Sequence, residues 1–196
     1  SGMPYEEFLQ KPLFTPLGMK DTTFYPTARQ LRRLAMDYRS TAEGLEEDPL
    51  QLEGRPLSDH SRYPAANAGL FSTARDYARF CQMLLNHGTF KGRCYLKPES
   101  VREMTRLQTG ELQTGFTPGD GWGLGVCVVR QPQGITAMLS PGSFGHGGML
   151  GTQAWIDPVR RVIYVMMMQR SNYPINADAS EARRAFQTAA AKALGF

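Results

Sequence analysis

The clearest hydrophobic pattern in the chain is a helical one that begins at Thr73. From there apolar positions recur every three or four residues with polar positions between them, which predicts an amphipathic helix with one buried face. The Thr73 hydroxyl can cap the first turn, and Asp76 stands three residues later in a capping-box-like arrangement. Gly88 ends the pattern. The predicted inner face consists of Tyr77, Phe80, Cys81, Leu84 and Leu85.

The C-terminal part of the chain holds short apolar segments separated by turn residues, a pattern typical of strands. Seven consecutive apolar residues, 162–168, predict a strand covered on both faces. The turn that leads into this strand begins at Asp157. An alanine-rich segment, 178–194, predicts a closing helix with Phe186 on its inner side. Further extended segments are expected at residues 122–130, 135–139, 145–150 and 153–156.

The N-terminal part shows weaker periodicity. Residues 4–14 predict a short helix that ends before Pro16, because proline cannot continue the hydrogen-bond ladder. An extended piece is expected at 22–25 and another short helix at 98–107. The segment 43–63 is acidic at first, contains prolines and lacks a period, so we expect a long surface excursion of the kind that borders substrate clefts.

Composition excludes several classes of function. The 196 residues carry 22 basic and 18 acidic side chains, a net charge of +4, without a long basic run. This argues against nucleic-acid binding, which concentrates positive charge on one face. No segment reaches the roughly 18 consecutive apolar residues of a membrane-spanning helix. Cys81, Cys94 and Cys127 are widely spaced and odd in number, which predicts buried free thiols rather than a zinc site or a disulfide framework.

The candidate chemistry lies in residues 143–152, SFGHGGMLGT. Glycines at 145, 147, 148 and 151 remove side chains where another backbone or a ligand comes close, and they flank the imidazole of His146. This pattern predicts a glycine-lined strand edge beside a hairpin, against which a substrate can lie. A lone His-Gly-Gly is a weak motif, so its order relative to the other segments matters.

With its neighbours, this segment resembles the third motif of the serine β-lactamase and penicillin-binding-protein superfamily. The branch concerned contains class C β-lactamases, β-lactamase-like esterases and D-alanyl peptidases, where the motif is often His-x-Gly. The resemblance covers nearly the whole chain. The other segments that carry it are residues 1–9 (SGMPYEEFL), 16–24 (PLGMKDTTF), 69–76 (GLFSTARD) and 121–125 (GWGLG).

The resemblance implies an α+β fold, an antiparallel sheet flanked by helices that forms the C-terminal part of a β-lactamase/transpeptidase-like domain. Residues 1–196 are then a single partial domain, mainly helix and loop over 1–120, with sheet strands and the closing helix over 121–196. The family's Ser-x-x-Lys and Tyr-x-Asn motifs are absent: no serine here precedes a lysine by three positions, and no tyrosine or serine precedes an asparagine by two. We expect them upstream, together with the nucleophile helix and N-terminal strands. A tag remnant before a start at Met3 is the other interpretation.

The resemblance also assigns roles within the motif. The backbone N–H of Met149 maps onto the oxyanion-hole donor, and His146 occupies the place of the family's lysine. Gly147 and Gly148 are candidate substrate contacts. Tyr63 lies outside the motif, in the excursion 43–63, and is a further candidate for lining the pocket. Because an imidazole is only partly charged at neutral pH, a neutral ester or amide suits His146 better than a carboxylate-bearing β-lactam or D-alanyl peptide.

The leading hypothesis is therefore the C-terminal part of a serine hydrolase that forms an acyl-enzyme from a small ester, amide or peptide. No metal or organic cofactor is implied, and the missing N-terminal half is needed for a complete site. The alternative is a non-catalytic binding protein that retains the fold. Elsewhere in the chain, we expect a solvated loop position for His60, a helix C-terminus for His87, and core positions for Trp122 and Trp155.

Overall fold

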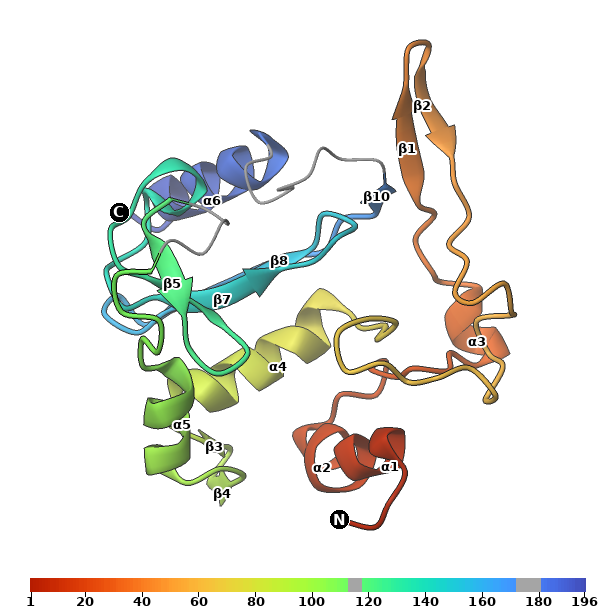
Figure 1. Ribbon diagram of the computed structural model, residues 1–196, viewed down its shortest axis with the longest axis horizontal. Helices are drawn as coiled ribbons and strands as arrows, with labels where there is room; N and C mark the ends of the chain where they lie inside the picture. Colours follow the sequence, from red (N-terminus) through yellow and green to blue (C-terminus); the bar gives the residue numbers. More distant parts are fainter. Residues whose placement is uncertain (113–117, 172–180) are drawn as a thin grey trace.

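The computed structural model describes residues 1–112, 118–171 and 181–196 (Figure 1). The helical segments are α1 (Tyr5–Leu9), the π-helix Gln10–Phe14, α2 (Thr15–Leu17), α3 (Ala28–Leu31), α4 (Ala74–Leu85), α5 (Pro98–Thr105), the 3₁₀-helix Gly134–Thr136 and α6 (Glu181–Ala193). The strands are β1 (Tyr38–Thr41), β2 (Gly44–Glu47), β3 (Thr89–Phe90), β4 (Arg93–Cys94), β5 (Asp120–Trp122), β6 (Cys127–Val129), β7 (Phe144–Gly147), β8 (Gln153–Asp157), β9 (Val162–Met166) and β10 (Arg170–Ser171).

A five-stranded antiparallel sheet forms the centre of the molecule, in the order β5-β6-β7-β8-β9. Helix α4 packs on one face of this sheet and α6 on the other, so the sheet lies between two helical layers (Figure 1). The predicted α+β class, an antiparallel sheet flanked by helices, is confirmed. The apolar segment 162–168 contains β9, which both helices contact as predicted.

Two apolar clusters fill the spaces on either side of the sheet. The larger joins α4, represented by Leu84 and Leu85, to Phe144 and Ile156 of the sheet. The smaller lies on the α6 side and contains the buried side chains Cys127, Val129, Leu139, Trp155 and Tyr164, with Phe186 of α6 packed against them. The closing helix therefore has Phe186 on its inner side as predicted. Residues 178–180 of that prediction lie outside the described residues.

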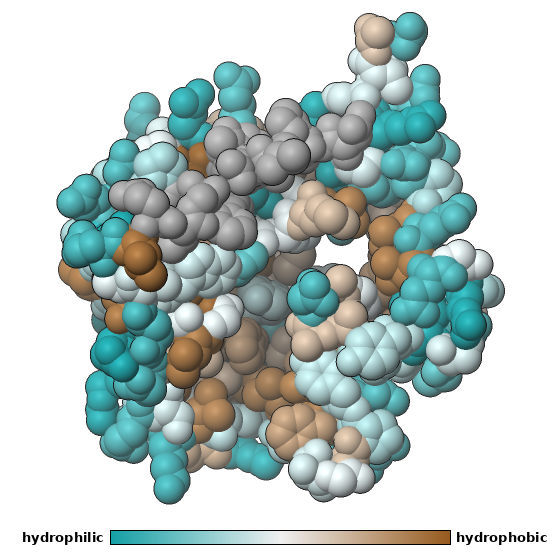
Figure 2. Space-filling model, viewed as in Figure 1, coloured by the Kyte–Doolittle hydropathy of each residue, from teal (hydrophilic) through white to brown (hydrophobic). Residues whose placement is uncertain are grey.

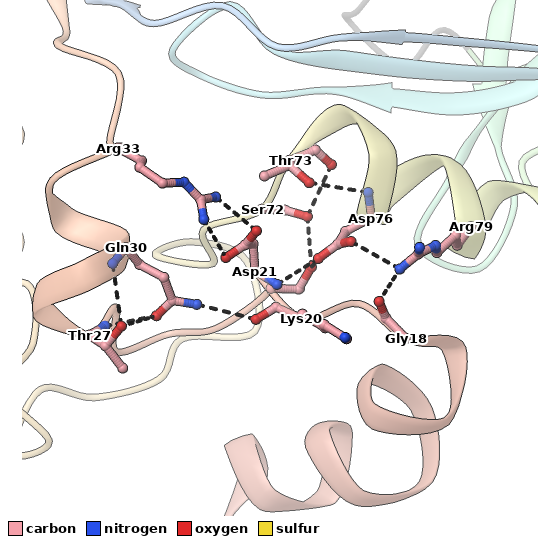
Figure 3. A network of polar contacts seen from close by, with 11 residues as sticks. Gly18, Lys20, Asp21, Thr27, Gln30, Arg33, Ser72, Thr73, Asp76 and Arg79 are labelled. Carbon is pink, nitrogen blue, oxygen red and sulfur yellow. Dashed lines mark hydrogen bonds and ion pairs between the residues drawn. The ribbon is translucent and has the colours of Figure 1, made fainter.

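Helix α4 forms where the sequence predicts it, and a polar network ties it to the N-terminal segment (Figure 3). The Thr73 hydroxyl caps the helix by accepting a hydrogen bond from the Asp76 N–H. The buried Asp76 carboxylate does not complete the predicted capping box. It accepts instead from the Asp21 N–H at 2.7 Å, while Arg33 pairs with the Asp21 carboxylate at 2.8 Å. The hydrogen bond from Arg33 lowers the pKa of Asp21.

The N-terminal helix runs further than expected. It continues past Pro16 to Leu17 and stops at Gly18, whose φ of 72° is left-handed. The π-helical stretch Gln10–Phe14 contains another proline, so the helix departs from the α pattern where prolines remove donors. The expected extended piece at 22–25 reduces to a single bridge between Thr23 and Phe71.

Two further predictions about the sheet are wrong. Residues 122–130 form no continuous strand: β5 and β6 pair as a hairpin whose tight turn is closed by a hydrogen bond from the Gly123 N–H to the Val126 carbonyl. The expected extended segment 135–139 begins instead within the 3₁₀-helix Gly134–Thr136, where the Thr136 hydroxyl bonds back to the Gln133 carbonyl.

The surface excursion is preceded and partly formed by a hairpin that the sequence does not predict. Strands β1 and β2 pair with each other, and β10 joins β1 in parallel, giving the order β10-β1-β2. The hairpin projects from the body of the molecule (Figure 1). Side chains link it to β10: the Arg170 guanidinium donates to the Ser40 hydroxyl and the Ser171 hydroxyl to the Asp48 carboxylate, each at 2.6 Å.

Apolar side chains also remain exposed on the N-terminal elements. Figure 2 shows a hollow in the face that is displayed, with apolar side chains gathered around it. The large apolar residues that are exposed within residues 1–45 are Met3, Tyr5, Phe8, Leu34, Met36, Tyr38 and Leu45. None of the helices in the described ranges is long and apolar enough to cross a membrane.

The turn from β8 to β9 begins at Asp157, as predicted. Its side chain is fully buried and accepts four hydrogen bonds: from the Ser140 N–H and hydroxyl at 2.9 and 2.8 Å, and from the Val159 and Arg160 N–H groups at 3.0 Å each. Burial favours the neutral form of the carboxyl, but the hydrogen bonds outweigh it and the pKa of Asp157 is lowered. The carboxylate thus joins the sheet to the Ser140 loop.

Candidate active site

The glycine-rich segment forms β7 and the turn that follows it. Of the expected extended stretch 145–150, only the part up to Gly147 is strand; the rest turns back into β8. Gly145 lies opposite Trp155 on β8. A Cβ atom on Gly145 would stand 2.1 Å from the Ala154 carbonyl oxygen, which no side chain permits. The glycine therefore allows β7 and β8 to approach closely.

His146 lies on β7 with an exposed side chain, opposite Ala154 of β8. Its ring packs beside that of Trp122 on β5, with centroids 5.2 Å apart and an interplanar angle of 51°. Trp122 is half-buried, so it contributes to the core as predicted and also borders the imidazole. The His146 Nδ1 atom contacts the Gly147 carbonyl oxygen. Because a carbonyl only accepts, this contact places the proton on Nδ1, and the neutral ring then has its acceptor on Nε2.

The turn after β7 contains the predicted oxyanion donor. The Gly148 N–H donates to the Thr152 carbonyl at 2.7 Å, and the Gly151 N–H donates to the Gly148 carbonyl at 3.1 Å. Between these two bonds stands Met149, whose side chain is 84% exposed. Among the residues that the structure describes, none accepts a hydrogen bond from the Met149 N–H. This turn presents a backbone donor at the surface.

One cationic side chain and one backbone N–H group hold the carbonyl groups of the same turn from inside the protein. Arg183 of α6 is buried, with 1% of its surface exposed, and its guanidinium donates to the carbonyl oxygens of Gly148, Thr152 and Gly151 at 2.6, 2.8 and 3.2 Å. The Leu150 carbonyl accepts from the Arg170 N–H at 2.9 Å. These carbonyl groups therefore face the protein, and the Met149 N–H, at the opposite end of the Gly148–Met149 peptide, points away from Arg183.

Sequence reasoning did not identify Arg183. The sequence nevertheless contains a pattern that points to it. The buried side of α6 repeats every four residues, at Arg183, Gln187 and Ala191. A polar residue on such a buried stripe needs a hydrogen-bond partner. Gln187 finds one in the Gln153 side chain of β8 at 2.9 Å.

The structure does not bring Tyr63 to this site. Its side chain is 74% exposed, and its N–H donates to the Glu53 carboxylate in the same loop at 3.2 Å. Among the described residues, no interaction joins Tyr63 to β7. His60 is exposed as expected and stacks on Tyr25 at 4.4 Å, and His87 lies exposed at the C-terminal end of α4.

A cavity of about 200 Å³ occupies a different part of the molecule, between the end of α4, α5 and the start of β7. Its walls are mainly apolar, from residues such as Leu84, Val101 and Phe144, and it includes neither His146 nor the Met149 turn. The cavity therefore lies apart from the residues that the sequence motif singles out. In the described part of the chain, no three His, Cys, Asp or Glu side chains are arranged to hold a metal ion.

Comparison with known proteins agrees with this architecture. The chain is 36% identical over 178 residues to Protein Rv1367c of Mycobacterium tuberculosis, a match that covers 85% of this chain and 43% of the relative. A protein of Salmonella paratyphi B, provisionally named a D-alanyl-D-alanine carboxypeptidase, is 27% identical over 188 residues, covering 89% of this chain and 42% of the relative. The chain thus spans less than half the length of these curated relatives.

Among solved structures, that of EstCE1, described as a hydrolase with promiscuous acyltransferase activity, superimposes with a TM-score of 0.76. The match covers 97% of this chain and 51% of EstCE1 at 24% identity, so it establishes the fold. The model of the family described as Beta-lactamase matches residues 1–190. The chain belongs to the Beta-lactamase family, within the superfamily of serine β-lactamases and penicillin-binding-protein-like proteins.

Proposed function

We propose that this chain is the C-terminal part of a serine hydrolase that cleaves a small ester or amide through an acyl-enzyme. The observation that carries the proposal is the Met149 turn. Its N–H lacks an acceptor among the described residues, while the carbonyls around it are held by Arg183 and the Arg170 N–H. A backbone donor fixed in this way is ready to stabilise charge without reorganising during the reaction.

In the proposed mechanism the nucleophilic serine comes from a Ser-x-x-Lys segment outside these 196 residues. Its oxygen attacks the substrate carbonyl carbon, and the oxyanion that forms accepts hydrogen bonds from the Met149 N–H and from the serine's own N–H. The lysine and tyrosine of the missing motifs take the proton of the serine hydroxyl and pass it to the alcohol or amine, which leaves as its bond to the carbonyl carbon breaks. Water attacks the resulting acyl-enzyme and releases the acid.

His146 supports a neutral substrate in this proposal. Its ring stands beside Trp122 at the end of the strand that leads to Met149, so its Nε2 atom can accept one hydrogen bond next to the reacting carbonyl. An imidazole gives a carboxylate less attraction than a fixed cation does. Esters and simple amides are therefore favoured over β-lactams and D-alanyl peptides as substrates. The Salmonella relative is, however, provisionally named a D-alanyl-D-alanine carboxypeptidase.

The test uses the gene product that carries this sequence. We expect it to hydrolyse a p-nitrophenyl ester and, in intact-mass analysis after rapid quenching, to show an increase equal to one acyl group. A β-lactam and a D-alanyl-D-alanine peptide are the comparison substrates and should react more slowly. A gene product without Ser-x-x-Lys, or one inert towards all three substrates, contradicts the proposal and indicates a non-catalytic binding protein.

A further inference from the structure

The Arg183 side chain forms a hydrogen bond with the Gly148–Met149 peptide group of the candidate site. Its Nη2 atom donates to the Gly148 carbonyl at 2.6 Å, the shortest of its three hydrogen bonds to the turn. The same carbonyl accepts from the Gly151 N–H at 3.1 Å. The Gly148 carbonyl and the Met149 N–H are the two ends of one peptide unit, so Arg183 holds the opposite end of the proposed oxyanion donor.

The geometry of a peptide unit turns this contact into a constraint on the donor. A trans peptide is planar, with its C=O and N–H pointing in opposite directions, and none of the peptide bonds described is cis. With the carbonyl directed at Arg183 of α6, the Met149 N–H points away from α6. Rotation of this peptide would break the hydrogen bonds to both Arg183 and Gly151, which leaves the donor in one orientation.

The contact also changes the strength of the donor. A hydrogen bond from a cation to the carbonyl oxygen polarises the amide, which makes the N–H of the same unit a better donor. Burial increases this effect, because Arg183 has only 1% of its surface exposed and water screens its charge little. Three carbonyls around one planar guanidinium satisfy a fork of donors that a lysine ammonium cannot reproduce.

We infer that Arg183 is a positioning residue that orients and polarises the Gly148–Met149 peptide for the oxyanion. The inference rests on the proposed function for its kinetic consequence. A purely structural Arg183 would only hold the β7–β8 hairpin to α6, and its loss would lower stability without affecting kcat selectively. The two roles therefore differ in how kcat and KM respond at a temperature where every variant is folded.

The matched variants are Arg183→Lys, Arg183→Gln and the control Arg184→Gln. Arg184 is the next residue of α6, its side chain is 59% exposed, and it makes one long ion pair to Glu181 at 3.8 Å. For ester hydrolysis by the gene product, we expect kcat to fall about tenfold in Arg183→Lys and about a hundredfold in Arg183→Gln. KM should stay within about twofold in both, because the donor acts in the transition state. The control should keep both constants.

Hydrogen–deuterium exchange of the same proteins separates failure of the inference from failure of the proposed function. We expect amides of residues 148–152 to exchange faster in both Arg183 variants than in Arg184→Gln. If the protein hydrolyses nothing, the proposed function fails, and unchanged exchange would still overturn the anchoring of the turn. If hydrolysis proceeds and Arg183→Lys has the wild-type kcat, the positioning role is overturned. Should Arg183→Gln fail to fold, the lysine variant decides the question.

Discussion

The buried Asp157 carboxylate offers the sharpest test of how the sheet is held together. Four donors point at its two oxygens, two from Ser140 and two from the backbone of Val159 and Arg160. In Asp157→Asn one oxygen becomes an NH₂ group. The lowest-cost orientation directs this group at Ser140, because the Ser140 hydroxyl can rotate and accept, whereas the Ser140 N–H then lacks an acceptor.

The loss of folding stability caused by this substitution can be estimated from the hydrogen bonds that are lost or weakened. One buried N–H without an acceptor costs about 1–3 kcal/mol, and hydrogen bonds to a neutral amide are each about 1 kcal/mol weaker than those to a carboxylate. We therefore expect a loss of about 3 kcal/mol, a large part of a total stability of roughly 5–15 kcal/mol. For a chain of this size the melting temperature should fall by about 6–12 °C.

The pH dependence follows from the lowered pKa of Asp157. A carboxyl with a lower pKa in the folded than in the unfolded state stabilises the fold above the unfolded value of about 3.9 and loses this contribution as pH falls through the folded value. The difference in melting temperature between wild type and Asp157→Asn should have its full size at pH 7 and should shrink below about pH 4. Thermal unfolding, monitored by circular dichroism at several pH values, measures both the fall in melting temperature at pH 7 and its decrease at lower pH.

The control is Glu103→Gln, which removes another carboxylate with a low pKa. Hydrogen bonds from Arg106 and Gln108 lower the pKa of Glu103 to about 2, but this ion pair is exposed, and solvent screens it. We expect the control to melt like wild type. A melting temperature of Asp157→Asn within about 2 °C of wild type, or a difference in melting temperature that persists undiminished at pH 3, would show that these four hydrogen bonds do not stabilise the fold as expected.

Two further predictions concern packing and thiol chemistry. Gly145→Ala should destabilise the protein by about 1–3 kcal/mol in urea unfolding, because the new Cβ would lie 2.1 Å from a backbone oxygen on β8; an unchanged midpoint would contradict the close approach. Cys94 is exposed, which corrects the expectation of buried thiols, whereas Cys81 and Cys127 are buried and burial raises the pKa of Cys81 to about 12. When the native protein is treated with iodoacetamide, its mass should therefore increase by one adduct, and the Cys94→Ser variant should gain none. Two rapid adducts on the native protein would be inconsistent with the burial of Cys81 and Cys127.

Elements whose signals are local could be predicted from the sequence. Helix α4 is one, because its capping residue and apolar stripe lie within sixteen residues of each other, and β8 and β9 are others, because each is a short apolar run beside a turn. The β1–β2 hairpin was missed for the opposite reason. Its strands are polar and largely exposed, and its third partner, β10, lies far along the chain.

In the candidate site too, the features with local sequence signals could be predicted, and the long-range contacts could not. The glycine pattern around His146 located the strand and its turn, but not the contacts that hold the carbonyl groups of the turn. Arg183 reaches the Gly148 carbonyl from 35 residues away in sequence, and Asp76 bonds to the Asp21 N–H from 55 residues away. Such pairings depend on how the elements pack, so a single sequence indicates that a buried polar group needs a partner without identifying it.

We have proposed that the Met149 N–H stabilises the oxyanion of a serine hydrolase, and two substitutions at this position test the proposal directly. Met149→Pro removes the N–H, whereas Met149→Leu keeps it and alters only an exposed side chain. The measurement is kcat for ester hydrolysis by both variants of the gene product, each with its fold verified by circular dichroism. We predict a loss on the order of 10²–10³ in kcat for the proline variant and wild-type activity for the leucine variant. Equal activity of the two folded variants would contradict it.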